Sequence, residues 1–127
     1  VTAITDVTGF GLLGHLLEIC QGSNLSAVLQ FDEVPLLNSA VLDYLAQGCV
    51  PGGSKRNWDS IQQNVSGTDP QSQALLCDPQ TSGGLLVAVE PQVSDQVREL
   101  LERANCYAQP IGELVKSHAE SAIRVIR

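Results

Sequence analysis

The chain has 127 residues, the size of one domain with a single core; 43% are hydrophobic but only 4% aromatic, so aliphatic side chains must fill that core. Fourteen acidic against seven basic residues give a net charge of −7, and no basic run exceeds Lys55–Arg56, which argues against a nucleic-acid partner. No apolar run approaches the roughly 20 residues that span a bilayer, and the first residues do not resemble a signal peptide, so we expect a cytoplasmic protein with no membrane partner.

Residues 5–18, TDVTGFGLLGHLLE, combine a glycine-rich turn with the start of an apolar helical pattern. This pattern predicts a largely buried helix that begins near Thr8, places Phe10 on its apolar face and ends before Gly22. Asp6 and Thr8 precede the helix, where their oxygens can cap free backbone N–H groups, or where those N–H groups can bind a phosphate. From these residues alone, a capping role and a ligand-binding role both stay open.

Five potentially reactive side chains fall outside these roles. His15 lies within the apolar helix, where a hydrogen bond in the core is more common than metal ligation. The four cysteines occur in unrelated contexts and form no CxxC pair, so we expect buried free thiols rather than a zinc site or disulfides at Cys20, Cys49, Cys77 and Cys106.

The next part of the chain alternates regular and irregular patterns. Residues 25–31 predict a strand, residues 32–35 a turn, and residues 38–47 a helix with Asn38 as its cap. Residues 48–73 are rich in glycine and amides and predict a long loop with at most short helical turns. Within it, Lys55, Arg56 and Asn57 follow two glycines, an arrangement that either binds an anion or is a solvated turn.

Residues 77–89, CDPQTSGGLLVAV, place four small residues directly before an apolar run that predicts a central strand over residues 85–89. Hydroxyl groups and backbone N–H groups beside paired glycines can bind anionic oxygens, although the same residues also form ordinary turns. These candidates are Thr81, Ser82, Gly83 and Gly84. The order, loop then strand, is the reverse of a Walker phosphate loop, and no GxxxxGK[ST] motif occurs, so a standard P-loop is excluded.

The last third of the chain predicts a clear amphipathic helix over residues 91–105 and strands over residues 108–115 and 122–126, joined by a polar turn at residues 117–121. Helices are thus interspersed among four short strands. We therefore predict an α+β fold, a four-stranded mixed sheet with helices packed on it.

Three motifs occur in a fixed order: TDVTGFGLLGH at residues 5–15, VPGGSKRN at residues 50–57 and DPQTSGGLL at residues 78–86. Together they resemble the C-terminal domain of the bacterial selenophosphate synthetases (selenide, water dikinases), within the wider aminoimidazole ribonucleotide synthetase-like family. The resemblance covers essentially the whole chain. It implies one domain, residues 1–127, that is a truncated C-terminal domain of a two-domain enzyme.

The resemblance also implies a function for the full-length protein. Enzymes of this family use ATP, selenide and water to make selenophosphate, AMP and phosphate with Mg²⁺ present, and the expected assembly is a homodimer. The resemblance implies that Asp6 is a magnesium ligand at the boundary with the N-terminal domain. We expect the nucleotide to contact the residues already singled out in the other two motifs, namely Arg56, Asn57, Thr81, Ser82, Gly83 and Gly84.

In the resembling family the reactive cysteine or selenocysteine, a lysine and most magnesium-binding aspartates belong to the N-terminal domain. We therefore expect no catalytic residue in this chain and no activity from it alone. A helical segment usually precedes the first motif, and its absence here predicts exposed apolar surface and self-association. Two alternatives are another ATP-dependent family member, such as a purine-biosynthetic synthetase, against which PGGSKRN argues, and a non-catalytic packing or dimerisation module.

Overall fold

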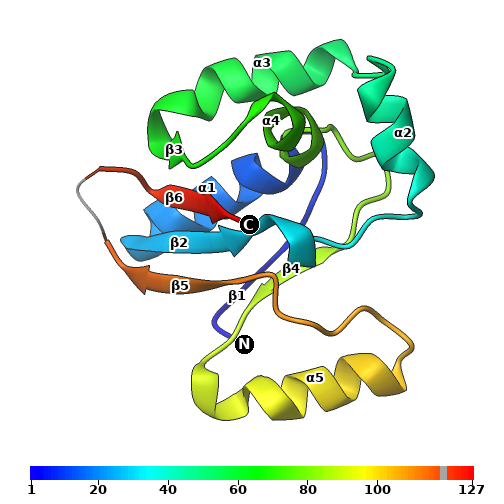
Figure 1. Cartoon of the computed structure of the whole chain (residues 1–127). Helices are drawn as coiled ribbons and strands as arrows, with labels where there is room; N and C mark the ends of the chain where they lie inside the picture. Colours follow the sequence, from blue (N-terminus) through cyan, green and yellow to red (C-terminus); the bar gives the residue numbers. More distant parts are fainter. Residues whose placement is uncertain (118–119) are drawn as a thin grey trace.

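Two β-sheets form the framework of the computed structural model, which describes residues 1–117 and 120–127 (Figure 1). The strands are β1 Ala3–Asp6, β2 Leu25–Gln30, β3 Val65–Ser66, β4 Leu85–Ala88, β5 Gly112–Lys116 and β6 Ile123–Ile126. The larger sheet has the order β3–β6–β2–β5 and is mixed, because β2 is antiparallel to β5 whereas β6 is parallel to both β2 and β3. The smaller sheet is an antiparallel pair of β1 and β4.

Five α-helices accompany the sheets within the described residues: α1 Gly11–Ser23, α2 Ala40–Ala46, α3 Gly52–Ile61, α4 Pro70–Leu76 and α5 Ser94–Arg103. The first of these, α1, packs on β2 and β6, and α3 and α4 pack in turn on α1. By contrast, α5 lies beyond β1 and β4, at the opposite end of the molecule from α3 (Figure 1). Three short 3₁₀ turns, Phe31–Glu33, Gln62–Asn64 and Pro91–Val93, complete the described elements.

The hydrophobic core lies between α1 and the four-stranded sheet. Aliphatic side chains dominate it, as the low aromatic content requires. Its least accessible members are Leu13, Cys20, Leu29, Leu76, Cys77 and Ile123. Burial raises the pKa of the Cys77 thiol to about 11, which makes it a poor nucleophile at neutral pH. Cys20 and Cys77 are therefore buried free thiols as predicted, whereas the prediction is wrong for Cys49 and Cys106, which are exposed free thiols.

The predicted α+β fold with a four-stranded mixed sheet is confirmed, but one member of the sheet differs. The predicted central strand, β4, pairs with β1 in the smaller sheet, and its first residue, Leu85, is 65% exposed. Its place in the larger sheet is taken by β3, which lies within the predicted loop. The reason is a long-range contact: the register sets Asp6 opposite Leu85, which holds β4 against the start of the chain.

The prediction of a long loop over residues 48–73 is wrong, because α3, β3 and the start of α4 fall within it. Apolar periodicity is weak there, since α3 fully buries only Ser54 and Ile61. The Asp69–Pro70 pair, interpreted as a sign of a loop, is instead the start of α4. Asp69 accepts a hydrogen bond from the Ser72 backbone N–H at 2.8 Å, and the Ser72 hydroxyl accepts one from the Asp69 N–H at 2.9 Å, which is a capping box.

The first helix also begins and ends later than predicted. Residues 8–11 form a turn in which the Gly11 N–H donates to the Thr8 carbonyl at 3.0 Å, so α1 begins at Gly11. It continues through Gly22 and is terminated by Asn24, which adopts a left-handed conformation (φ 56°). Phe10 precedes the helix and is 59% exposed, so its predicted place in the core is wrong.

The remaining predicted elements are present with shifted ends. The strand predicted over residues 25–31 is β2, and the helix predicted over residues 91–105 is a 3₁₀ turn followed by α5. In the predicted helix at residues 38–47, Asn38 Oδ1 accepts a hydrogen bond from the Ala40 N–H at 2.9 Å, ahead of α2. The last two predicted strands are β5 and β6, and part of the predicted turn at residues 117–121 lies outside the described residues.

The α4 cap predicts a loss of stability in acid. The pKa of Asp69 is lowered to about 2, first by the backbone hydrogen bond from Ser72 and then by the side chain of Arg127, 2.8 Å away. Because the folded pKa lies below the ordinary 3.8, this stabilisation is present above about pH 4 and is lost as the pH falls toward 2.

We therefore expect the urea midpoint of unfolding to fall between pH 4 and pH 2, and to fall less in Asp69→Asn, which keeps a capping oxygen but does not titrate. Urea titrations at several pH values measure both. Identical pH profiles for the two proteins would contradict this assignment of the acid sensitivity to Asp69.

Candidate functional site

Two of the three motifs lie side by side at the end of β1. The Val7 N–H donates to the Gly84 carbonyl at 2.9 Å, and the Gln80 N–H donates to the Thr8 carbonyl at 3.1 Å. A Cβ atom on Gly83 would collide with the Val7 carbonyl oxygen, so only glycine permits this approach. The turn after Asp6 and the TSGG turn therefore form one surface.

The third motif joins this surface through Asn57. This residue lies on α3, and its amide nitrogen Nδ2 donates to the Gly9 carbonyl at 2.8 Å and to the Cys77 carbonyl at 2.9 Å. One side chain thus connects α3 to the turn before α1 and to the end of α4, directly before the DPQTSGGLL motif. The three motifs, which are spread over residues 5–86, meet in a single candidate site.

Asn57 is expected to contribute strongly to stability. Asn57→Asp replaces the donating amide by an acceptor facing two carbonyl oxygens, so we expect the free energy of unfolding to fall by about 2 kcal/mol or more. Gln63→Glu makes the same chemical change on an exposed side chain and should alter stability by less than about 0.5 kcal/mol. Urea unfolding of both variants measures the difference; equal effects would show that the two hydrogen bonds contribute little.

Asp78 is a member of the site that the sequence did not single out. Its carboxylate accepts hydrogen bonds from the Gln80 side chain at 2.7 Å and from the Ser54 hydroxyl at 3.4 Å. Partial burial raises the pKa of Asp78, and these two hydrogen bonds oppose the rise. The carboxylate thus links α3 to the TSGG segment. The only signal in the sequence was its place at the start of the DPQTSGG motif.

His15 is buried and hydrogen-bonded, as predicted. Its Nε2 lies 3.1 Å from the Thr8 hydroxyl, and its Nδ1 lies 3.1 Å from the Glu18 carboxylate. The Thr8 hydroxyl thus faces His15 rather than a helical N–H group, and the residue before α1, Phe10, provides no side-chain cap. The capping interpretation of Asp6 and Thr8 is therefore wrong.

The carboxylate of Asp6 is exposed and makes no hydrogen bond or ion pair with any described residue. Nowhere in residues 1–117 and 120–127 do three or more His, Cys, Asp or Glu side chains form a group that could hold a metal ion. Magnesium usually takes one or two protein carboxylates and completes its octahedron with waters and phosphates. Asp6 therefore fits a magnesium site to which this chain contributes only part of the ligands.

The predicted anion-binding side chains lie at the surface. Thr81, Ser82 and Arg56 are exposed, and none of them has a hydrogen-bond or ion-pair partner among the residues that the structure describes. Lys55 pairs with Asp59 at 3.0 Å, one turn further along α3. The two hydroxyls and the guanidinium are thus donors without a partner among the described residues. They lie near the backbone hydrogen bonds that join the motifs.

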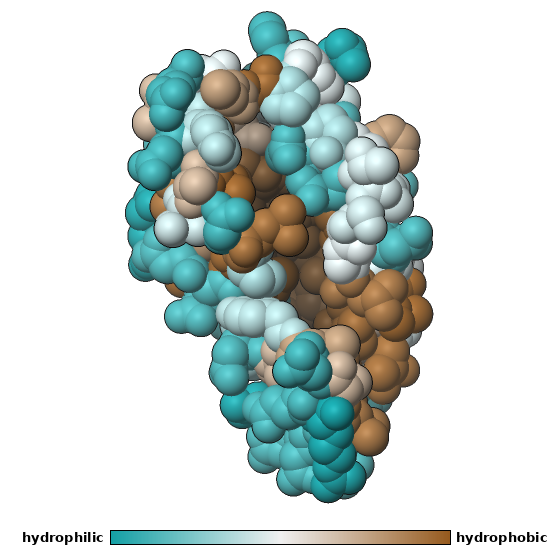
Figure 2. Space-filling model, turned by 90° about the vertical axis from the view of Figure 1, so that its right-hand side faces the viewer, coloured by the Kyte–Doolittle hydropathy of each residue, from teal (hydrophilic) through white to brown (hydrophobic). Residues whose placement is uncertain are grey.

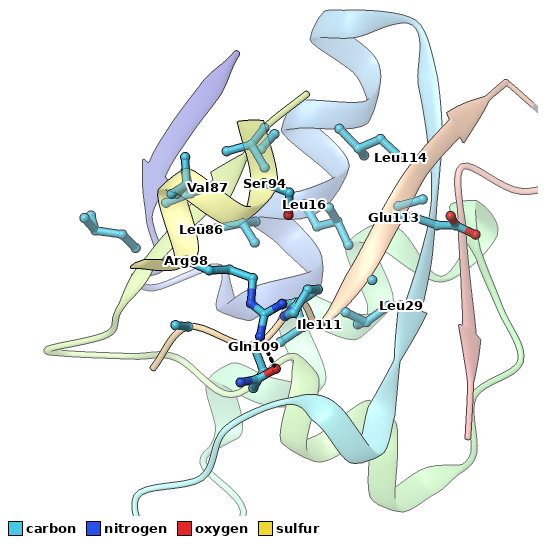
Figure 3. Close-up of a pocket in the computed structure, with 18 of the residues that line it drawn as sticks. Leu16, Leu29, Leu86, Val87, Ser94, Arg98, Gln109, Ile111, Glu113 and Leu114 are labelled. Atoms are coloured by element: carbon cyan, nitrogen blue, oxygen red, sulfur yellow. Dashed lines mark hydrogen bonds between the residues drawn. The ribbon is translucent and has the colours of Figure 1, made fainter. Parts of the chain in front are cut away.

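A second surface feature is an apolar groove of about 630 Å³ between α5 and the sheet. Its walls include Leu16, Leu29, Leu86, Val87, Ile111 and Leu114, several of which are labelled in Figure 3. Figure 2 shows apolar side chains gathered around this hollow, above a hydrophilic end of the molecule. Arg98 reaches into it toward Gln109, 3.4 Å away, and its buried Nε has no acceptor among the described residues.

This groove supports the expected self-association of the isolated chain, because large apolar surfaces favour association. Sedimentation velocity over a concentration series should show oligomers, and Leu101→Lys, within the groove, should shift them toward monomer. Leu37→Lys, at a residue that is 96% exposed and lies outside the groove, is the matched control and should have little effect. A strictly monomeric chain at high concentration would contradict the prediction.

The comparisons with known proteins decide the family. Residues 1–125 match the family model described as AIR synthase related protein, C-terminal domain. The chain belongs to this family. None of the helices in the described part of this family member is long and apolar enough to cross a bilayer.

Curated relatives of this family member are named selenide, water dikinase. The chain is 57% identical over 115 residues to the protein of Colwellia psychrerythraea. The aligned residues make up 91% of the chain and 33% of that relative. It is 52% identical over 127 residues to that of Photobacterium profundum (98% and 36%) and 54% identical over 125 residues to that of Haemophilus influenzae strain 86-028NP (98% and 35%). The chain thus spans about a third of the length of these relatives.

Proposed function

We propose that this chain is the C-terminal part of a selenide, water dikinase, a cytoplasmic enzyme that uses ATP, selenide and water to make selenophosphate, AMP and phosphate. The observation that supports this most directly is identity of 52–57% to proteins of that name over at least 91% of the chain. The meeting of all three motifs at one surface supports it independently, since their shared role requires proximity.

Within this proposal, the chain supplies one side of a nucleotide cleft. Asp6 provides a hard carboxylate ligand for Mg²⁺, which neutralises phosphate charge when bound. Thr81 and Ser82 provide hydroxyl donors, Gly83 and Gly84 provide accessible backbone, and Arg56 provides a guanidinium for the phosphates of ATP. Asn57 serves the same site by holding the turn before α1 against the end of α4, because its amide nitrogen donates to the Gly9 and Cys77 carbonyls.

The reactive chemistry is proposed to lie in the N-terminal domain of the full-length protein, which is the principal partner of this chain, and the enzyme is proposed to be a homodimer. The unoccupied donors and the exposed Asp6 carboxylate are consistent with a half-site that a second domain completes. No catalytic residue is assigned to the chain, which is expected to be inactive in isolation.

A chimera tests this function. Replacing the corresponding third of the Haemophilus influenzae dikinase by this chain should give an enzyme that forms AMP from ATP only when selenide is added. The matched control carries Thr81→Val and Ser82→Ala and should bind ATP more weakly. A folded chimera without selenide-dependent AMP formation would contradict the proposal. Full activity in the control would instead favour a packing role for the chain.

A further inference from the structure

The apolar groove lies between two open sheet edges. Within the described residues, β4 is an end strand of the smaller sheet and β5 is an end strand of the larger one. The groove is lined by every residue of 85–89 on one strand and of 111–114 on the other (Figure 3). Successive side chains of a strand point to opposite faces, so a groove over one face would be lined by alternate residues only. The groove therefore runs along the two edges.

The pairing of β4 with β1 shows which of its backbone groups face the groove. Opposed residues of an antiparallel pair alternate between hydrogen-bonded and non-hydrogen-bonded positions. The Val7 N–H donates to the carbonyl of Gly84, which lies opposite it, so Gly84 and Leu86 bond to β1. The N–H and C=O groups of Val87 therefore point away from β1, toward the open edge.

The same argument applies to β5, which pairs with β2. The Gln30 N–H donates to the carbonyl of the opposed Ile111 at 2.8 Å, so Ile111 and Glu113 bond to β2. The N–H and C=O groups of Leu114 then point away from β2. Both strands thus present backbone donors and acceptors to the groove that no described strand pairs.

Helix α5 also lacks a partner on its groove side. Val97 and Leu101 of α5 line the groove, yet none of the residues of this helix, all of them described, is fully buried. The buried Nε of Arg98 has no acceptor among the described residues, although buried donors are almost always paired. An occupant with apolar side chains and a free backbone carbonyl would cover the helix and accept from Arg98.

We propose that a β-strand from the N-terminal part of the full-length protein inserts between β4 and β5 and joins the two sheets into one. A strand in this place needs both of its edges free. Each of the six described strands already pairs along at least one edge, so a second copy of this fold offers no such strand. The chain spans about a third of its relatives, so the rest of the protein is the source. For that source alone, the inference rests on the proposed function.

The inserted strand is expected to be a short, near-continuous apolar run, because strands covered on both faces have that composition. Its insertion would also explain the sequence of β4. Residues 85–88, LLVA, predict an interior strand, yet in this chain they form an edge without the charge or proline that protects natural edges. With a strand inserted, β4 has a neighbour on each side.

Amide hydrogen exchange tests the two edges. In the proposed full-length dikinase, the N–H groups of Val87 and Leu114 should exchange at least about 100-fold more slowly than in this chain at a concentration where it is monomeric. Leu86 and Glu113 are matched controls on the same strands, since their N–H groups face β1 and β2 and should be protected in both proteins. Equally fast exchange of Val87 and Leu114 in the two proteins would overturn the inference.

Photo-cross-linking identifies the occupant. Leu85 lines the groove and is 65% exposed, so p-benzoylphenylalanine can replace it in the full-length protein. Mass spectrometry should find the adduct in an apolar run of about four to eight residues in the N-terminal part. The same replacement at Leu37, which is 96% exposed and outside the groove, should give no adduct with that run. Adducts only with β4 or β5 of a second copy would overturn the inference.

Neither measurement depends on turnover, so the two proposals can fail separately. Slow exchange of Val87 and Leu114 together with the N-terminal adduct would support the inserted strand even if no selenide-dependent AMP formation is found. Selenide-dependent AMP formation with fast exchange at both amides and no adduct would instead leave the proposed function intact and overturn the inserted strand.

Discussion

Gly11→Ala is expected to lower the free energy of unfolding by about 3 kcal/mol, the sum of left-handed backbone strain and overpacking. Gly11 has φ +71°, a conformation that side chains with a Cβ rarely adopt. A Cβ added there would lie 2.7 Å from the carbonyl carbon of Cys77, and a backbone atom cannot move aside as a flexible side chain can. Since domains are stable by only about 5–15 kcal/mol, this is a large fraction of the total.

Gly22→Ala is the matched control, because it makes the same substitution in the same helix. Gly22 is exposed, and a Cβ there meets nothing within 4 Å, so we expect a stabilisation of about 0.5 kcal/mol from helix propensity. Urea unfolding of the two variants compares them directly. Equal effects would mean that the close approach of α1 to Cys77 is not a source of constraint.

Gly11 also shows why the site could be anticipated only in part. The sequence shows a glycine-rich turn in residues 5–15, and one of its glycines, Gly11, has a positive φ and a close backbone neighbour that only glycine permits. It could not indicate that Cys77 is the approached partner, because the two residues are 66 positions apart and no local pattern encodes the contact. The local pattern therefore indicated the turn, whereas the contact with Cys77 that requires glycine at position 11 depends on long-range packing.

The fold shows the same division. The regular apolar periods predicted α1, β2 and α5 with shifted ends, because burial of one face fixes an amphipathic element. The two-residue strand β3 and the weakly apolar α3 have no such face, so the sequence predicted a loop there. The assignment of β4 to the smaller sheet depends on its pairing with β1, and pairing partners are not encoded in the strand itself.

The site was anticipated as three motifs rather than as one surface. Asn57 and Arg56 were grouped as neighbours in sequence, yet the Asn57 amide joins the turn before α1 to the end of α4 whereas Arg56 is exposed. Adjacent positions on a helix point about 100° apart, so neighbours in sequence need not share a role. This physical separation is why the motif VPGGSKRN contributes both to stability and to the proposed binding of phosphates.

Asp6→Asn in the proposed full-length dikinase is expected to reduce turnover about 100-fold or more, comparable to the removal of one strong electrostatic stabiliser. The substitution removes a charge from a proposed divalent-ion site and preserves the size of the side chain. The melting temperature should hardly change, because the Asp6 carboxylate caps no helix and has no partner among the described residues. Loss of activity without loss of stability distinguishes a ligand from a structural residue.

The measurement is turnover across a magnesium titration, together with thermal unfolding. Asp43→Asn makes the same change at an exposed residue on α2 and should leave turnover unchanged, which controls for the loss of one negative charge from an acidic chain. If magnesium binding is weakened, a high magnesium concentration should partly restore turnover in Asp6→Asn, since mass action refills a weakened site. Near-normal turnover of Asp6→Asn at low magnesium would show that Asp6 is not a magnesium ligand, because the loss of a charged ligand should weaken the affinity of the site for magnesium.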